Sequence, residues 1–233
     1  KDIIKREDPI FFLANKKNIL SNEKYSAKYA AVRGFSQMTN NRFFLLNNQN
    51  KLKLKKLNKI LTVKKRFIIF GFTYDIWSIL FKYFKISKKK IKKNKGILIH
   101  GGGWKKMEDK KINDKIFKKK IKETLGVEKV INYYGMIEQT GSVFLECEEG
   151  FFHPSVFSDI LIRDTNLNLS KKNEKGIVQV MSLLPLSYPG HNIMTEDIGT
   201  LHGIDNCKCG RKDKYFTING RIEKTEIRGC ADI

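Results

Sequence analysis

The fold of this chain is decided around residues 130–141, which read VINYYGMIEQTG. The apolar run Val130–Tyr134 predicts a short buried strand. Gly135 ends the run, because glycine tolerates backbone angles that other residues avoid. Glu138 and Thr140 follow, and ligands of open α/β sheets bind beyond the carboxyl ends of the strands. The turn is therefore a candidate site, although an ordinary turn with a solvated acid is the alternative.

A strand–helix pattern is repeated before this stretch. Apolar runs at 67–70 and 97–100 predict two buried strands, and each is followed by apolar residues at helical spacing, over 76–84 and 112–125. Gly126 is well placed to end the second helix. Short apolar strands that alternate with amphipathic helices are typical of a parallel sheet with right-handed crossovers. We expect an α/β fold whose glycine turns, one after each strand, lie at the same edge of the sheet.

The pattern is weaker at the start of the chain. Asp8-Pro9 predicts the start of a helix, and residues 30–35 predict a strand edge that runs into a turn. Residues 39–50, rich in Asn, predict a turn around a short apolar run. Leucine and isoleucine spacing over 52–61 predicts a lysine-coated helix.

Residues after Gly141 change character. Apolar runs at 143–147, 160–163, 176–181 and 215–218 predict short strands, and polar or Pro/Gly-containing turns separate them. We expect a small, mostly antiparallel β subdomain over 143–218. Asn219-Gly220 is a pair typical of hairpin turns.

Composition limits the possible functions. The chain has 233 residues, 41% of them hydrophobic, and a formal net charge of +22. Lysine far outnumbers arginine and occurs in runs such as 88–93, which indicates solvated faces; a nucleic-acid partner is therefore not expected. No run of about 18 apolar residues is present, so no membrane span is expected. Four cysteines are too few for a disulfide scaffold and favour a cytoplasmic location.

Seven segments in order resemble the acyl-protein synthetases of bacterial bioluminescence systems, members of the acyl-adenylate-forming superfamily. These segments lie at 31–36, 70–77, 100–106, 134–141, 187–191, 195–199 and 220–230. The phenylacetate–CoA ligase branch is also similar, through Cys207-Lys208-Cys209-Gly210-Arg211. The resemblance implies a partial adenylate-forming domain over 1–142, the β-rich subdomain over 143–218, and a hinge with the start of a C-terminal segment over 219–233.

The resemblance implies a two-step reaction. A carboxylic acid, a fatty acid by this likeness, reacts with ATP to give an acyl-adenylate and pyrophosphate, and the acyl group then passes to a thiol. Acyl-donor or acyl-reductase proteins are the expected partners. An acyl- or aryl-CoA ligase and a non-catalytic protein with an adenylating fold are the alternatives.

The family pattern also implies roles for individual residues. Glu138 would bind Mg²⁺, which screens phosphate charge, and Thr140 would lie near the phosphates. Asp197 would hold the ribose hydroxyls, and Arg221 the ribose or a phosphate. The remaining nucleotide contacts are expected from Gly101, Gly102, Gly103, Tyr134 and Gly135.

Two parts of the family pattern are missing. The Ser/Thr/Gly-rich phosphate loop of the superfamily is not in this sequence, which begins at Lys1 without Met. The usual C-terminal domain with a catalytic lysine is also missing, although acyl-protein synthetases are short at that end. Glu223 stands where many relatives have Asp at the hinge. We expect this chain to be part of a longer protein, and this segment alone to be inactive.

The cysteines suggest a metal site and a nucleophile. Cys147, His153, Cys207 and Cys209 have the ligand types of a tetrahedral Cys₃His zinc site; the alternative is a core cysteine and a polar loop. Cys230 follows Arg228-Gly229, close to cations that favour a thiolate. It matches the acyl-accepting cysteine of the acyl-protein synthetases, although a small residue after a tight turn is equally consistent.

Overall fold

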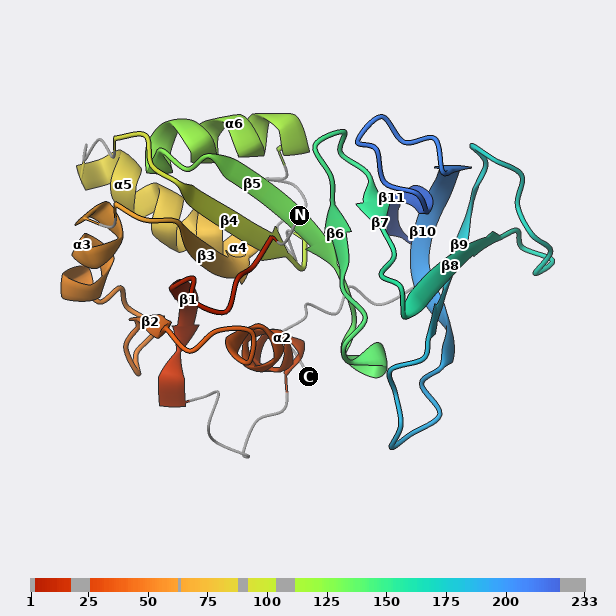
Figure 1. Cartoon of the computed structure of the whole chain (residues 1–233), viewed down its shortest axis with the longest axis horizontal. Coiled ribbons are helices and arrows are strands. Elements are labelled where there is room, and N and C mark those ends of the chain that lie inside the picture. The colour runs from red at the N-terminus through yellow and green to blue at the C-terminus, as the bar shows by residue number, and fades with distance from the viewer. Residues whose placement is uncertain (1–2, 18–25, 63, 88–91, 104–111, 223–233) are drawn as a thin grey trace. The chain divides into compact units, whose positions relative to one another are not determined.

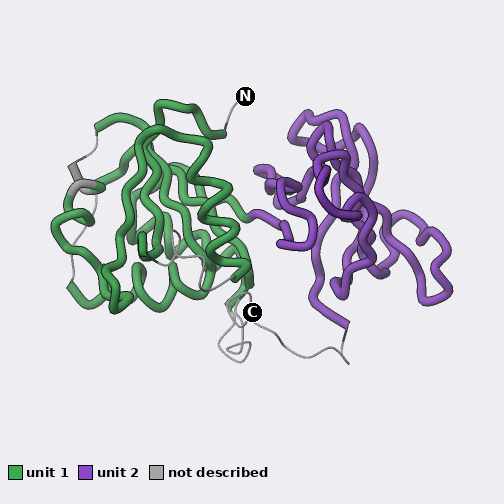
Figure 2. Tube along the Cα trace, turned by 90° about the horizontal axis from the view of Figure 1, so that it is seen from below, with its two compact units in different colours: residues 1–132, 228–233 green, residues 133–227 purple. Residues whose placement is uncertain are grey.

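A computed structural model describes residues 3–17, 26–62, 64–87, 92–103 and 112–222. The chain divides into two compact units, shown in different colours in Figure 2. Unit 1 holds the described residues up to Asn132, and unit 2 holds those from Tyr133 to Ile222.

Unit 1 is an α/β unit built on a five-stranded order, β2-β1-β3-β4-β5 (Figure 1). The pairs β1–β2, β1–β3 and β3–β4 are parallel. The strands and helices are β1 (Ile10–Asn15), α2 (Ala27–Ser36), β2 (Arg42–Leu46), α3 (Leu54–Thr62), β3 (Phe67–Phe72), α4 (Thr73–Asp75), the π-helix η1 (Ile76–Phe81), α5 (Lys82–Ser87), β4 (Gly96–Gly101), α6 (Asp114–Leu125) and β5 (Lys129–Tyr134). The predicted α/β class with a parallel βαβ sheet is confirmed.

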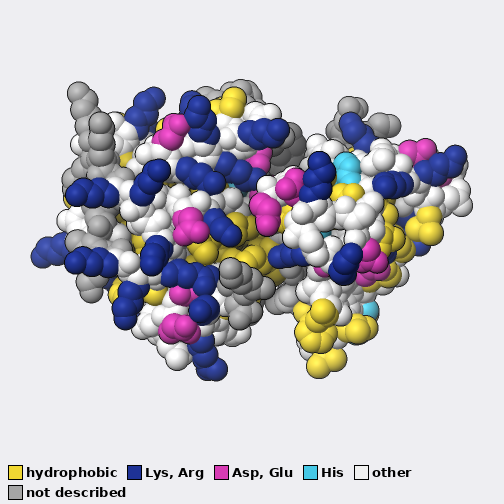
Figure 3. Space-filling view, turned by 45° about the horizontal axis from the view of Figure 1, so that its top comes forward, with side chains coloured by type: hydrophobic (Ala, Val, Ile, Leu, Met, Phe, Trp, Pro, Cys, Tyr) yellow, Lys and Arg dark blue, Asp and Glu magenta, His cyan; other side chains and the backbone are white. Residues whose placement is uncertain are grey.

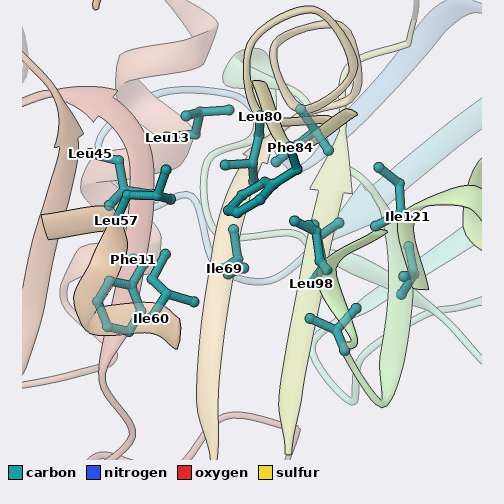
Figure 4. Close-up of a cluster of buried hydrophobic side chains, with 14 of the residues drawn as sticks. Phe11, Leu13, Leu45, Leu57, Ile60, Ile69, Leu80, Phe84, Leu98 and Ile121 are labelled. Atoms are coloured by element: carbon teal, nitrogen blue, oxygen red, sulfur yellow. The ribbon is translucent and has the colours of Figure 1, made fainter. Parts of the chain in front are cut away.

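Helices pack on both faces of this sheet. On one face, apolar residues of α3, η1, α5 and α6 form a core with the strands (Figure 4). On the other face, the ring of Phe35 of α2 packs at a tilt against that of Phe70 of β3, with ring centroids 4.3 Å apart. Strands that are buried on both faces have continuous apolar sequences. For this reason the apolar runs at residues 67–70 and 97–100 predicted β3 and β4. Gly126 ends α6 with a left-handed φ of 64°, as predicted.

Four expectations for unit 1 are wrong. Residues 42–46, expected within a turn, form the strand β2 and pair with β1. Pro9 precedes a strand, not a helix, because Ile10–Asn15 is buried and lies between β2 and β3 in the sheet. Residues 27–36 form a helix, and its N-cap Ser26 accepts a hydrogen bond from the Tyr29 amide. Gly71 lies inside β3, where an added Cβ would lie 2.9 Å from Ile76 Cδ1 and 3.0 Å from Leu13 Cβ. The strands therefore do not all end in glycine.

Unit 2 is antiparallel, with the strand order β6-β7-β11-β10-β9-β8. Its elements are the 3₁₀ turn η3 (Ile137–Gln139), β6 (Phe144–Glu146), β7 (Phe152–His153), β8 (Ser158–Arg163), β9 (Lys175–Ser182), β10 (Asn192–Ile204) and β11 (Lys214–Arg221). The last residues of β5, Tyr133 and Tyr134, pair with β6. The expectation of mostly antiparallel strands after the βαβ region is confirmed.

A small aromatic and β-branched core holds unit 2 together. Its buried members are Phe144, Phe152, Ile160, Ile162, Val178, Val180 and Phe216. The sequence did not predict β10, whose thirteen residues alternate between half-buried and exposed over much of their length. Asn219-Gly220 is not a hairpin turn, because β11 continues through both residues to Arg221.

Candidate functional site

The strongest polar cluster among the predicted nucleotide contacts lies in unit 2. The Tyr134 hydroxyl donates to Asp197 Oδ2 at 2.7 Å. Arg221 Nε lies 3.5 Å from Asp197 Oδ1, and Arg221 Nη2 lies 3.3 Å from Glu196 Oε2. The structure thus brings Tyr134, Asp197 and Arg221 together.

Strand pairing explains how these residues meet. Asp197 on β10 is the direct partner of Arg221 on β11, and the Ile222 amide donates to the Glu196 carbonyl. Directly opposite residues of an antiparallel pair hold their side chains about 5 Å apart at Cβ. The register of one hairpin therefore sets the Asp197–Arg221 contact, and the carboxyl end of β5 supplies Tyr134.

Tyr134 stays protonated in this cluster. Burial raises the pKa of its phenol well above the ordinary value, and the Asp197 carboxylate raises it further. A protonated phenol donates one hydrogen bond, so Tyr134 fixes one oxygen of Asp197 in place. Each carboxylate oxygen has two lone pairs, so Asp197 keeps acceptor capacity for a ligand hydroxyl.

The side chains of the turn after β5 differ in their exposure to solvent. Glu138 and Thr140 are exposed, whereas Gln139 between them is fully buried. The Thr140 hydroxyl donates to the Ile137 carbonyl at 3.0 Å, and the Thr140 amide donates to the Tyr188 hydroxyl at 3.0 Å. Gly135 adjoins the turn, and a Cβ there would lie 3.0 Å from the Ser142 carbonyl oxygen.

Gln139 is a residue that sequence reasoning missed. Its amide nitrogen lies 2.9 Å from the Gly190 carbonyl oxygen and 3.3 Å from the Val180 carbonyl oxygen, and donates to both. These bonds anchor the turn that carries Glu138 and Thr140 to the end of β9 and the following loop. The sequence alone cannot show whether this glutamine is buried or exposed, because its partners lie more than 40 residues away along the chain.

The predicted glycine run lies in unit 1, at the end of β4. Gly102 and Gly103 have left-handed φ angles of 76° and 61°. A Cβ on Gly102 would lie 2.3 Å from Phe72 Cδ1, whereas one on Gly103 would meet no atom within 4 Å. The turn after Gly101 therefore requires glycine at 102 for space as well as for backbone angle.

His100 precedes this turn and is neutral. Burial, with a smaller effect of Lys118, lowers the pKa of His100 to about 3. The Gly101 carbonyl can only accept, so the Thr73 hydroxyl donates to it at 3.0 Å and accepts from His100 Nδ1–H at 2.9 Å. His100 lies in the segment 100–106, but the sequence predicted no role for its side chain.

The four predicted metal ligands also come together, in unit 2. One ligand atom from each of Cys147, His153, Cys207 and Cys209 lies within 4.8 Å of all the others. Cys147 follows β6, His153 ends β7, and the two other cysteines lie in the loop between β10 and β11. Burial raises the pKa of the Cys207 thiol to about 12.

Cys230, the predicted nucleophile, and the hinge residue Glu223 lie outside the described residues.

The family model for acyl-protein synthetase, LuxE, matches residues 8–233. The chain belongs to the acyl-protein synthetase family. No curated protein matches the chain.

Solved adenylate-forming proteins share the fold of this acyl-protein synthetase family member. An open conformation of 2-hydroxyisobutyryl-CoA ligase, in complex with 2-HIB-AMP and CoA, is 16% identical with a TM-score of 0.67, and the match covers 96% of this chain and 51% of that one. The adenylation domain of a keto acid-selecting NRPS module is 12% identical, with a TM-score of 0.62 and coverage of 94% and 45%. MbtA of Mycobacterium smegmatis is 11% identical, with a TM-score of 0.58 and coverage of 94% and 39%.

The present chain therefore spans about half the length, or less, of these solved structures. The predicted fold, part of an adenylate-forming domain, is confirmed.

Within the described residues, no helix is long and apolar enough to cross a membrane. In Figure 3, lysine and arginine side chains are spread over the visible face with acidic side chains among them.

Proposed function

We propose that the protein containing this chain activates a carboxylic acid with ATP as an acyl-adenylate and transfers the acyl group to a protein thiol. The single observation that carries the proposal is the cluster of Tyr134, Asp197 and Arg221 in a member of the acyl-protein synthetase family. These residue types suit a nucleotide, because a carboxylate accepts from ribose hydroxyls and a guanidinium donates to phosphate.

Asp197 is the ribose ligand in this proposal. Tyr134 and Arg221 approach its two oxygens and hold the carboxylate in one orientation before ATP binds. Arg221 is 45% exposed in its side chain, so its remaining N–H groups are accessible to a phosphate. Prepositioned groups of this kind lower the entropy lost when a ligand binds.

Glu138 is the proposed Mg²⁺ ligand, and Thr140 the proposed phosphate neighbour. Both are exposed at the end of β5, and Gln139 between them fixes the turn. Mg²⁺ prefers oxygen ligands and is commonly held by one or two carboxylates together with substrate phosphates. When bound, the cation would reduce the repulsion between the phosphates and the attacking carboxylate. The contact of Gly101, Gly102 and Gly103 with the adenine stays a prediction that rests on the family resemblance alone.

Cys230 is the proposed acyl acceptor. Its thiolate would attack the carbonyl carbon of the acyl-adenylate, the bond to the phosphate oxygen would break, and AMP would leave. The family match, which extends over Cys230, supports this choice. A fatty acid is the proposed substrate class, by the same likeness, and an acyl-donor or acyl-reductase protein the proposed partner.

The test is acid-dependent release of pyrophosphate by the full-length protein. ATP, Mg²⁺ and a panel of fatty, aryl and sugar-derived acids are supplied, and one class of acid is expected to stimulate release. Asp197→Ala is expected to abolish most of it. Asp159→Ala is the matched control, since Asp159 lies in the same unit and pairs with Lys214 instead. No release with any acid would contradict the proposal and favour a non-catalytic adenylating fold.

The identity of the thiol is tested separately. With a radiolabelled acid, we expect a thioester on the protein that Cys230→Ser removes while pyrophosphate release continues. Release of acyl-CoA on addition of CoA, unchanged by Cys230→Ser, would favour an acyl- or aryl-CoA ligase.

A further inference from the structure

The loops at one end of unit 2 bring together three cysteine sulfurs and one imidazole nitrogen from two hairpins. Cys147 and His153 belong to the β6–β7 hairpin, and Cys207 and Cys209 to the β10–β11 loop. None of the proposed steps of acid activation uses these residues. His153 and Cys207 are buried, and the other two cysteines are half-buried.

The distances within this cluster match the size of a tetrahedral zinc site. Cys147 Sγ lies 4.0 Å from Cys207 Sγ, and Cys209 Sγ lies 3.5 Å from His153 Nε2. Sulfur ligands at about 2.3 Å and nitrogen ligands at about 2.0 Å from a tetrahedral Zn²⁺ are separated by roughly 3.4–3.8 Å. The sulfur–sulfur distance between Cys147 and Cys207 far exceeds that of a disulfide bond, about 2.05 Å.

His153 is oriented as a metal ligand requires. Its Nδ1 is hydrogen-bonded to a carboxylate oxygen of Asp213, the residue just before β11. Because a carboxylate accepts, Nδ1 carries the proton and Nε2 turns its lone pair toward Cys209. A carboxylate behind a ligating histidine is the common arrangement in zinc proteins, where it fixes the tautomer and the ring orientation.

We propose that Cys147, His153, Cys207 and Cys209 bind one structural Zn²⁺, and that Asp213 is the positioning residue for His153. Four protein ligands close the coordination sphere, which is typical of structural sites and leaves no position for a substrate. Binding displaces the thiol protons to solvent, so the three sulfurs ligate as thiolates.

The position of the site on the hairpin supports a structural role. Asp197 lies near the middle of β10, and the cysteine loop follows the end of this strand at Ile204. At about 3.3 Å per residue, that stretch of strand is roughly 20 Å long. The zinc is therefore too far from Asp197 to act on a nucleotide there. It instead joins the β6–β7 hairpin to the β10–β11 hairpin, in a unit whose apolar core is small.

The first experiment is metal analysis of the full-length protein, purified without chelator. We expect one zinc per chain, and thiolate-to-cobalt charge-transfer absorption when Co²⁺ replaces it. Cys207→Ser and Cys209→Ser are expected to lose more than nine-tenths of the metal. Cys230→Ser is the matched control and is expected to retain it. Absence of zinc and of the cobalt spectrum, or a disulfide between Cys147 and Cys207 by mass spectrometry, would overturn the proposal.

Asp213→Asn keeps the proposal testable where the cysteine variants fail to fold. This substitution preserves size and all four ligands, so the stoichiometry at saturating zinc is expected to stay at one. The zinc affinity, measured by competition with a chromophoric chelator, is expected to fall about 10- to 100-fold. An unchanged zinc affinity would remove Asp213 from the proposal.

Thermal unfolding of the wild-type protein is a further test. A chelator is expected to lower the unfolding temperature, and Zn²⁺, but not Mg²⁺, is expected to restore it. An unfolding temperature that changes with neither chelator nor Zn²⁺ would contradict a structural metal.

Discussion

The Tyr134 hydroxyl donates a 2.7 Å hydrogen bond to Asp197 Oδ2, across 63 positions of sequence. Tyr134 lies at the carboxyl end of β5 and Asp197 within β10, so the bond joins the βαβ part of the sequence to the antiparallel part. Both residues belong to unit 2. The contact orients the carboxylate that we assign to the ribose.

Removal of this bond tests the orienting role. Tyr134→Phe deletes one hydroxyl and keeps the ring, which packs near Phe144 and Phe152. A hydrogen bond to a charged group contributes about 1.5–3 kcal/mol, so we expect ATP affinity to fall by about one to two orders of magnitude. Isothermal titration calorimetry of the full-length protein with ATP measures this affinity. Tyr215→Phe in the same unit is the control, and an equal loss in both variants would argue against a specific role for Tyr134.

Glu138 and Gln139 are neighbours with opposite predicted effects. Gln139→Leu removes the side-chain donor of two hydrogen bonds, to the Val180 and Gly190 carbonyls. A hydrogen bond contributes about 0.5–1.5 kcal/mol, and a buried carbonyl left without any donor costs about 1–3 kcal/mol. We expect the free energy of unfolding in urea to fall by about 2–4 kcal/mol. Glu138→Gln changes an exposed side chain, so stability should stay within about 0.5 kcal/mol while pyrophosphate release falls. Loss of stability in Glu138→Gln with normal release would reverse these assignments.

The two glycines after β4 form a matched pair. Both have left-handed backbone angles, but only at Gly102 would a Cβ collide with Phe72. Gly103→Ala should cost about 1 kcal/mol of unfolding free energy, from backbone strain alone. Gly102→Ala should cost clearly more, because Phe72 must move. Thermal and urea unfolding compare the two, and equal costs would mean that Phe72 adjusts freely.

His100 predicts a pH dependence of stability. Its pKa in the folded protein is lowered to about 3, mainly by burial, against about 6.5 in an unfolded chain. Below about pH 6.5, His100 is protonated in the unfolded chain but stays neutral in the folded protein. The free energy of unfolding therefore falls as pH falls from about 6.5 toward 3, by at most about 1.4 kcal/mol per pH unit.

A variant that lacks only His100 isolates this contribution. Between pH 7.5 and pH 5.0, His100→Asn should lose about 2 kcal/mol less unfolding free energy than the wild-type protein. His191→Asn, at an exposed position, is the control and should follow the wild-type curve. Parallel curves for His100→Asn and the wild-type protein would show that His100 is not the group responsible.

Local pattern was sufficient for the centre of unit 1. The buried strands β3, β4 and β5 are short apolar runs, and α6 shows apolar residues at helical spacing with a glycine cap at 126. These features depend on residues within one or two turns of each other, so the sequence by itself determined them. The order of its motifs also determined the family.

Only the tertiary structure decided the rest, because the deciding contacts join distant residues. Ile10–Asn15 is a strand because β2 and β3 flank it, although the preceding Asp8-Pro9 suits a helix start. Gln139 is indistinguishable in sequence from a solvated glutamine until Val180 and Gly190 are beside it. Asp213 becomes relevant only when β11 brings it to His153. Residue types predicted which chemistry was possible, whereas strand register determined which side chains meet.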